Sequence, residues 1–240
     1  MIDIHSHILY GVDDGAPTME ESVKMLKKAR ELGITTIFAT PHYQENLFDL
    51  EGITQRFLEV VEKAWAYDIT LKPGSEVYIN PFIDRLVKEK KLLLLNRSDY
   101  ILLELPYESI PLFASELIYK LQLQRISIIL AHPERNINLV KDFSLFAGFL
   151  ERGCMMQVDA GSIAGAYGTA VQEYAKRLVK LKLVHFVASD AHCAKDYEQW
   201  YLKAYTKVCR WADSGYADRL FLHNPRLIME NSKESIYNMI

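Results

Sequence analysis

Cysteine is scarce in this chain, and its spacing excludes two common uses of the residue. The 240 residues contain three cysteines, Cys154, Cys193 and Cys209, and no two of them form a Cys-x-x-Cys pair. An odd number without such a pair argues against a disulfide framework and against a thiolate zinc site. We therefore expect the protein to work in the reducing cytoplasm.

Long hydrophobic runs and an excess of positive charge are also missing. The apolar stretches, such as residues 92–95 and 126–131, are far shorter than the roughly 20 residues that cross a bilayer. The first residues, Met-Ile-Asp-Ile-His, show no signal-peptide pattern. The formal net charge is -3, and Lys and Arg form no basic stripe of the kind that nucleic-acid binders use. We expect neither membrane insertion nor a nucleic-acid partner.

The remaining composition is that of an ordinary globular protein. Half of the residues are hydrophobic and a quarter are charged, a balance that argues against disorder or a coiled coil. A single α/β barrel commonly reaches 240 residues, and the chain contains no internal repeat, low-complexity tract or linker. The sequence thus predicts one domain over residues 1–240.

Short aliphatic runs alternate with amphipathic stretches along the chain, which predicts parallel strands joined by helices. The expected strands are residues 2–4, 34–39, 70–71 running towards 77, 100–103, 127–130, 155–158 and 184–188. The expected helices are residues 53–67, 81–90, 115–124, 143–152 and 169–180, followed by a helical tail over 200–230 with a break near Asn224-Pro225.

The first of these units carries the clearest boundary signals. Thr18 and Glu21 have the spacing of a capping box at the start of a helix, and Gly33 is placed to end that helix. Pro41 then breaks the pattern after the second strand and turns the chain. Gly153 is expected to end the helix over residues 143–152.

Histidines and carboxylates recur where the expected strands end. The set is His5, His7, His42, Glu76, Glu104, His132, Asp190 and His192. Because the carboxyl ends of parallel barrel strands meet at one rim, these side chains are expected to converge. Taken singly, each histidine has an alternative as a satisfied core residue and each carboxylate as a salt-bridge partner. Taken together, they favour a metal site.

The ligand types indicate the chemistry. Imidazoles and carboxylates without thiolate suit zinc, manganese or iron, and so many ligands fit more than one ion. Such a site lowers the pKa of bound water and neutralises charge on a phosphoryl group, so it favours hydrolysis of a phosphate ester.

Several short motifs resemble the polymerase and histidinol phosphatase (PHP) superfamily. They are residues 4–7 (Ile-His-Ser-His), 40–42 (Thr-Pro-His), 74–76 (Gly-Ser-Glu), 103–104 (Leu-Glu), 131–135 (Ala-His-Pro-Glu-Arg) and 189–192 (Ser-Asp-Ala-His). The opening residues 1–15, residues 157–162 and Asn224-Pro225 are similar to its branch of capsule-associated bacterial tyrosine phosphatases. The resemblance runs in order from residue 1 to about residue 228.

The resemblance implies a distorted (β/α)7 barrel that binds two or three divalent metal ions. Manganese is the expected ion, with iron, zinc or magnesium as alternatives. It also implies that the eight histidines and carboxylates above are ligands, with Asp14 as a ninth. Asp14 lies in a Val-Asp-Asp-Gly turn, where a carboxylate can instead satisfy turn amides, and Asp13 competes for the role.

The resemblance further implies that arginines hold the substrate phosphate. Arg135 matches one of them, although a salt bridge to Glu134 or another acid is the alternative. A second arginine of many relatives, five residues beyond the last histidine of the Asp-Ala-His motif, is Tyr197 here. Lys195 could supply charge instead, without the bidentate geometry of a guanidinium. We expect Arg135, Asp190 and His192 to act in catalysis, and Arg135 and Lys195 to hold the phosphate.

The function that follows is a metal-dependent protein tyrosine phosphatase. The implied substrate is a bacterial tyrosine kinase that controls capsule or exopolysaccharide synthesis. The alternatives are another phosphoesterase of the superfamily, such as a histidinol phosphate phosphatase or a small nuclease, and a non-catalytic binding module. Cys193 could be read as a nucleophile, but no arginine-rich phosphate loop follows it.

Overall fold

Nine short strands in the described residues form two parallel sheets. The computed structural model describes residues 1–43 and 49–231. One sheet has the order β1-β2-β4, with β1 (Ile2–Ser6), β2 (Thr36–Ala39) and β4 (Thr70–Pro73). The other has the order β3-β5-β6-β7-β8-β9, with β3 (His42–Tyr43), β5 (Glu76–Tyr78), β6 (Tyr100–Glu104), β7 (Ser127–Ala131), β8 (Met155–Asp159) and β9 (Phe186–Ala188).

The two sheets are parts of one distorted barrel. The chain passes from β2 to β3 through Thr40-Pro41 and from β4 to β5 through Gly74-Ser75, so two of the barrel's strands are each broken in two. The sheets also meet where β1 lies beside the segment after β9. There Ser6 forms a parallel bridge with Ala191, and Asp190 N donates to His5 O at 2.9 Å. Counting each broken strand once, the described residues supply seven strand positions, which confirms the predicted (β/α)7 barrel.

The breaks correct one strand prediction. Residues 70–77 were expected to form a single strand, and they form β4 and β5 instead. A Cβ at Gly74 would lie 2.8 Å from Leu95 Cδ2, so the chain passes its neighbour too closely for a side chain. Pro41 lacks the amide hydrogen that would continue the ladder from β2.

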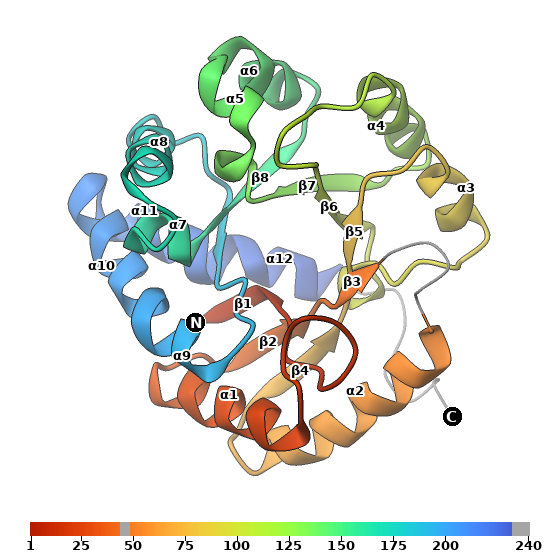
Figure 1. The fold of residues 1–240 in the computed structure, drawn as a ribbon, viewed down its shortest axis with the longest axis vertical. Helices are drawn as coiled ribbons and strands as arrows, with labels where there is room; N and C mark the ends of the chain where they lie inside the picture. Colours follow the sequence, from red (N-terminus) through yellow and green to blue (C-terminus); the bar gives the residue numbers. More distant parts are fainter. Residues whose placement is uncertain (44–48, 232–240) are drawn as a thin grey trace.

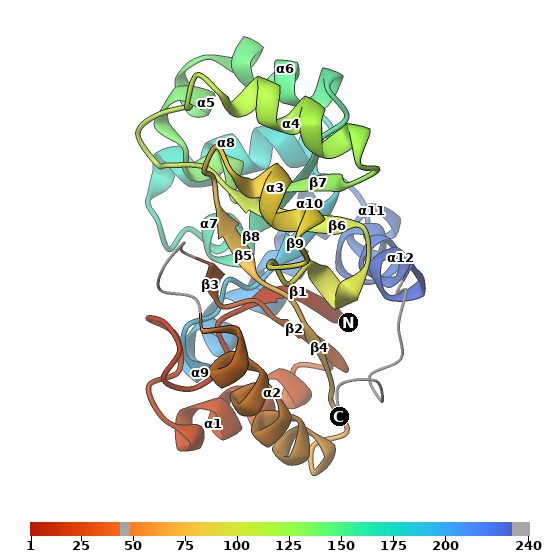
Figure 2. The same ribbon diagram turned by 90° about the vertical axis from the view of Figure 1, so that its right-hand side faces the viewer.

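Helices surround the strands (Figures 1 and 2). Those that follow the predicted ranges are α1 (Met19–Glu31), α2 (Leu50–Trp65), α3 (Ile83–Lys88), α4 (Ala114–Leu123), α6 (Phe143–Glu151) and α8 (Thr169–Lys180). The short helices α5 (Ile137–Lys141) and α7 (Ala160–Ala164) were not predicted. Within the described ranges, no helix combines the length and the apolar character needed to cross a membrane.

The predicted capping box of α1 is wrong. Thr18 is the N-cap residue, but its side chain accepts no capping hydrogen bond. The Glu21 carboxylate accepts from Ala194 N at 3.0 Å and so joins α1 to the segment after β9. Gly33, with φ of 81°, follows the end of α1 as expected.

The predicted break in the helical tail lies at a different place. The tail consists of α9 (Ala194–Asp196), the π turn η3 (Tyr197–Tyr201), α10 (Leu202–Trp211), α11 (Ser214–Asp218), the π turn η4 (Arg219–His223) and α12 (Asn224–Glu230). The break falls at Ala212-Asp213, whereas Asn224 keeps helical angles and Pro225 is absorbed at the start of α12. The π turn η4 ends directly before α12, so Pro225 lies in the first turn of that segment, where a missing amide hydrogen is tolerated.

An apolar layer fills the inside of the barrel below the strand ends. Its buried members include Ile4, Phe38, Leu102 and Ile129, and Ile228 of α12 packs against them. Asn96 Nδ2 donates to Met229 O at 3.2 Å and holds α12 in place. A second, larger core lies between the strands and the helices.

Candidate metal centre

The inner face of the barrel changes from apolar to polar towards the carboxyl ends of the strands. Side chains two residues apart on a strand share a face. Accordingly, Glu104 follows Leu102 on β6, and Asp190 follows Ala188 beyond β9. His132 (φ 31°) and Asp190 (φ 49°) both adopt the left-handed backbone region. Such strain at strand ends is typical of functional sites.

The deepest group of candidate ligands contains His5, His7, Glu76 and Asp190, all of them buried. His5 Nε2 lies 3.2 Å from Glu76 Oε2 and 3.3 Å from Asp190 Oδ1. His7 Nε2 lies 3.4 Å and 3.2 Å from the same two oxygens. The four ligand atoms therefore surround one point.

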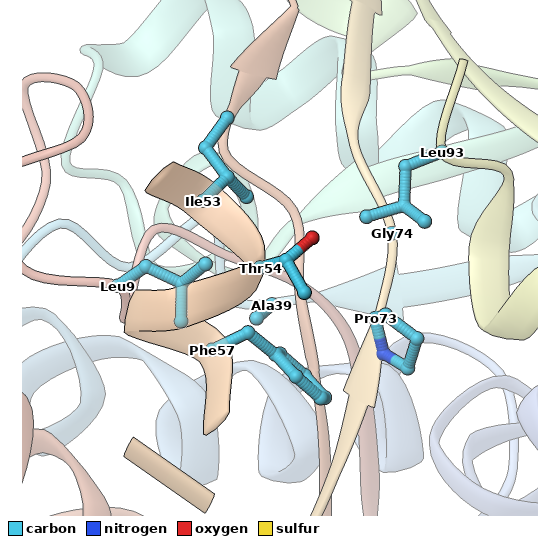
Figure 3. A pocket seen from close by; sticks show the side chains of 8 residues that line it. All are labelled: Leu9, Ala39, Ile53, Thr54, Phe57, Pro73, Gly74 and Leu93. Atoms are coloured by element: carbon cyan, nitrogen blue, oxygen red, sulfur yellow. The ribbon is translucent and has the colours of Figure 1, made fainter. Parts of the chain in front are cut away.

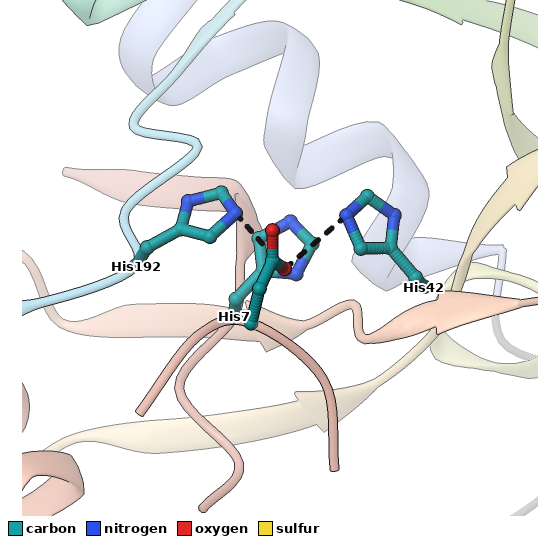
Figure 4. A group of neighbouring side chains, drawn as sticks. His7, His42 and His192 are labelled. Atoms are coloured by element: carbon teal, nitrogen blue, oxygen red, sulfur yellow. Dashed lines mark ion pairs between the residues drawn. The ribbon is translucent and has the colours of Figure 1, made fainter. Parts of the chain in front are cut away.

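A second group shares His7 and opens to solvent. It contains His7, Asp14, His42 and His192. Asp14 Oδ1 lies 3.5 Å from His42 Nε2 and 3.4 Å from His192 Nε2. Figure 4 shows the three imidazoles turned towards one another, with these ion pairs dashed. The Asp14 side chain is 70% exposed, so this group lies at the outer edge of the cluster.

A third group is centred on Glu76 and Glu104. His42 Nδ1 lies 3.0 Å from Glu76 Oε2 and 3.8 Å from Glu104 Oε2. His132 Nε2 lies 2.8 Å from Glu76 Oε1 and 3.9 Å from Glu104 Oε1. All nine predicted ligands are thus brought together, and Glu76 is shared between two groups.

The geometry fits metal ions better than hydrogen bonding. Glu76 Oε2 is buried and accepts no hydrogen bond, yet ring nitrogens of His5, His7 and His42 lie 3.0–3.4 Å from it. Ligand atoms spaced in this way can share an ion at bond lengths of about 2.1 Å. Imidazole and carboxylate donors suit a divalent transition metal.

A layer of hydrogen bonds orients the histidines. Asp13 Oδ2 accepts from His7 Nδ1 at 2.7 Å, and Gln157 Oε1 accepts from His5 Nδ1 at 2.9 Å. His192 Nδ1 donates to Asp190 O at 2.9 Å. Each bond leaves Nε2 directed at the cluster, as in metal sites whose ligands are positioned by carboxylates and carbonyls. Asp13 and Asp14 therefore occupy different positions, Asp13 behind His7 and Asp14 among the candidate ligands.

The concentration of carboxylates shifts the pKa values of the buried imidazoles. Burial alone would lower the pKa of His5, but Glu76 and Asp190 outweigh it and raise that pKa to about 9. For His132, burial is likewise outweighed, by Asp159 and Glu76, and the pKa rises to about 10. In the metal-free protein these rings hold protons at neutral pH, and a metal ion binding there must displace them.

Arg135 lies on the wall of the cluster. Its Nη1 donates to Asp159 Oδ2 at 3.1 Å and to Asp190 Oδ2 at 2.9 Å. The guanidinium carbon lies 4.8 Å from the ring centroid of Tyr107 and 4.3 Å from that of Tyr167. The salt-bridge alternative is therefore realised with Asp159 and Asp190 rather than with Glu134. Arg135 also lines the cavity above the cluster, so its guanidinium is placed to contact a phosphate bound there.

That cavity has a volume of about 480 Å³. Seven of the candidate ligands line it together with Arg135 and Asp196, and its aromatic lining consists of Tyr78, Tyr107, Tyr167 and Trp200. A separate hollow between α2 and the strand breaks, lined by Leu9, Phe57 and other mostly apolar side chains, measures only about 10 Å³ (Figure 3). It has room for about one water molecule, so it is too small to hold a substrate.

Two sequence-derived positions fall outside the cavity lining. Lys195 is exposed on α9 and is not among the described residues that line the cavity. Tyr197 is fully buried, and its hydroxyl donates to Asp3 Oδ2 at 2.8 Å and lies 3.0 Å from Ser6 Oγ. An arginine at position 197 would therefore enter the core instead of reaching the cavity.

Sequence reasoning missed the residues around the ligands. Gln157 and Asp159 alternate along the otherwise apolar strand β8, a pattern that points two polar side chains into the barrel. This alternation could have identified Gln157 and Asp159 from the sequence alone. Tyr107 and Tyr167 lie in loops and Trp200 lies in the π turn η3, where no regular periodicity marks an aromatic residue as part of a cavity.

Comparison with known proteins shows the family of the chain. The model of the CpsB/CapC family, described as capsular polysaccharide synthesis, matches residues 1–230. The chain belongs to this family. The tyrosine-protein phosphatase YwqE of Bacillus subtilis is 38% identical over 199 residues, covering 81% of this chain and 78% of YwqE. CpsB of Streptococcus pneumoniae, also a tyrosine-protein phosphatase, is 30% identical and covers 95% and 98% of the two chains.

Solved structures agree with the CpsB/CapC assignment. A crystal structure from the study of YwqE and CpsB, which calls them unique metal-dependent tyrosine phosphatases, superposes with a TM-score of 0.90 at 33% identity. The match covers 98% of this chain and 96% of that one. A β-aspartyl dipeptidase from Fervidobacterium islandicum reaches a TM-score of 0.60 at 14% identity, over 95% and 72% of the two chains. The latter likeness concerns the barrel fold alone.

Proposed function

We propose that this protein is a metal-dependent protein tyrosine phosphatase whose cavity binds two or three divalent ions, with manganese the first candidate. The observation that supports it is the convergence of nine side chains at the strand ends: His5, His7, Asp14, His42, Glu76, Glu104, His132, Asp190 and His192. Residues 1–240 would act as one catalytic domain, because the cluster draws on strands from both sheets.

The bound ions would polarise the phosphoryl group and lower the pKa of a water molecule. Arg135 would contact the phosphoryl oxygens, since its guanidinium lines the cavity and is held in place by Asp159 and Asp190. Asp190 and His192 would act in catalysis as ligands that hold the metal ions in place. Lys195 is a weaker candidate for phosphate binding than it was from sequence, because it is not among the described lining residues.

The chemistry of the cavity favours an aryl phosphate. A phenolate leaving group has a conjugate-acid pKa near 10 and needs little help from a general acid. Tyr78 and Tyr107, which are 41% and 43% exposed, lie at the cavity together with Trp200 and offer ring surfaces to a phenyl group. Histidinol phosphate, an alkyl ester, would gain less from both features.

The physiological substrate would be the phosphorylated tail of a bacterial tyrosine kinase in capsule or exopolysaccharide synthesis, reached in the cytoplasm. The family supports the link with capsule synthesis. A non-catalytic binding module is the rival from another class, and the complete ligand set argues against it.

The test is a phosphatase assay with defined metals. Purified protein treated with chelator should lose activity towards a phosphotyrosine peptide, and manganese should restore it. Histidinol phosphate should be a much poorer substrate. Full activity in protein shown by elemental analysis to be free of metal would disprove the proposal, and a preference for histidinol phosphate would favour the other phosphoesterase class.

A further inference from the structure

A second hollow adjoins the metal cavity on the side of α10. It measures about 510 Å³ and is lined by Ala164, Gly165, Ala166, Gln199, Trp200 and Lys203. These residues come from the end of α7 and the start of the long tail helix, which pack side by side (Figure 1). We refer to this hollow as the α7–α10 groove.

The groove is continuous with the site that would hold phosphotyrosine. Trp200 lines both hollows, and its ring meets Tyr167 edge to face with centroids 5.9 Å apart. Tyr167 in turn stacks on Arg135 and directly follows Ala166 in the groove. A chain leaving the cavity on this side therefore passes over Trp200 into the groove.

The groove carries positive charge in a chain that is acidic overall. Lys203 lines it, and within the described residues no carboxylate lies within ion-pair distance of its ammonium. Lys207, one turn further along α10, donates to Ala164 O at 3.3 Å. Burial and the neighbouring Lys203 lower the pKa of Lys207. Lys203 and Lys207 are four residues apart on α10, so their like charges lie on one face of the helix.

The acids near this pair have other partners, and the opposing effect of Glu173 on the pKa of Lys207 is smaller than that of Lys203. The Glu173 carboxylate is paired with Lys176 Nζ at 3.1 Å. Glu198, on the adjoining π turn, lies 3.5 Å from Lys28. Asp196 accepts from the backbone nitrogen atoms of His192 and Cys193.

We propose that the α7–α10 groove binds acidic residues that flank the phosphotyrosine of a protein substrate, with Lys203 as their main counter-ion. An extended peptide advances about 3.3 Å per residue, so residues that flank the phosphotyrosine, rather than the phosphotyrosine itself, are the ones that reach beyond Trp200. The proposal rests on the phosphatase function proposed above and adds the substrate's sequence preference to it.

The test compares two phosphotyrosine peptides that differ only in having Glu or Gln at the flanking positions. The small aryl ester para-nitrophenyl phosphate serves as a substrate that cannot reach the groove. Lys203→Glu is the informative variant, Lys203→Ala the milder one, and Lys63→Glu on α2, far from α10, the matched control for surface charge.

Lys203→Ala should raise KM for the Glu peptide about threefold, and Lys203→Glu about tenfold at low salt, in the range of an exposed ion pair lost or reversed. The kcat, the KM for the Gln peptide and the rate with para-nitrophenyl phosphate should stay near wild type. Lys63→Glu should change none of them. Added salt should reduce the advantage of the Glu peptide.

Equal KM values for the two peptides would refute the proposed role of the groove. An equal change in KM for both peptides in Lys203→Glu would refute it as well. Fluorescence anisotropy of the labelled peptides separates this failure from that of the enzyme. If neither peptide is dephosphorylated, the proposed function fails. In that case a Glu peptide that still binds more tightly than the Gln peptide, and loses this advantage in Lys203→Glu, would support the groove, and equal binding would refute it.

Discussion

Removal of Arg135 tests whether this side chain binds phosphate or only holds the wall together. Its Nη1 is shared by Asp159 and Asp190, which are 0% and 4% exposed, and the arginine itself is 20% exposed. Arg135→Ala therefore leaves the Asp159 carboxylate buried without its cation. Removing one partner of a buried pair costs about 3–5 kcal/mol, so the variant should unfold at a lower temperature whatever its role in catalysis.

The catalytic effect is a separate quantity. A charge-assisted contact to a developing oxyanion is worth about 2.7–4 kcal/mol, or about 100- to 1000-fold in kcat. Among the described residues that line the cavity, Arg135 is the one arginine, so no second guanidinium there would compensate. We expect kcat/KM for a phosphotyrosine peptide to fall by this factor at saturating metal, well below the unfolding temperature.

Arg135→Lys separates charge from shape. The ammonium keeps the charge but loses the planar group that lies between the rings of Tyr107 and Tyr167. It should recover part of the lost kcat/KM. The assay is steady-state kinetics together with metal analysis and thermal unfolding of each variant. If Arg135→Ala keeps near wild-type kcat/KM with its metals bound and loses only stability, Arg135 is a structural partner of the two aspartates.

Three further variants address single residues. Asp13→Asn should weaken metal binding by about 10- to 100-fold, because Asp13 orients His7; unchanged affinity in a chelator competition would contradict that role. Cys193→Ser should keep most of the activity, since burial raises the pKa of the thiol; a loss as severe as that of Asp190→Asn, with metal content unchanged, would restore the nucleophile reading. Tyr197→Phe should lower the free energy of unfolding by about 1–2 kcal/mol, because Asp3 loses a buried hydrogen bond. Its kcat/KM should be retained, and a denaturant unfolding curve equal to that of the wild type would contradict the prediction.

The positions of the candidate ligands could be predicted because they depend on topology. Parallel strands bring their carboxyl ends together wherever the exact boundaries fall. Glu104 at the end of β6 and His132 just after β7 were therefore expected to meet, and their side chains lie 3.9 Å apart. A boundary error of one or two residues does not alter this outcome, because the alternation of inward and outward side chains is set by the apolar positions before them.

Features that depend on particular contacts between distant segments were not predictable. The break between β4 and β5 depends on how closely Gly74 approaches Leu95, and the sequence contains only the glycine. The Glu21 side chain bonds to Ala194 instead of capping its own helix, because the segment after β9 packs against α1. In both cases a local pattern competes with a contact that exists only after folding.

Tyr197 shows that a matching position in the sequence does not guarantee a matching function. The family resemblance implied an arginine at this position, but a π turn begins at this residue and its side chain packs against β1. A count of residues from His192 therefore identifies a position in the chain, whereas the direction of the side chain depends on how the segment packs against β1. Trp200, three residues later in the same turn, faces the cavity. Under our proposals, Trp200 and Lys203 carry substrate recognition by this segment, and any search for further positive charge at the site should begin there rather than at position 197.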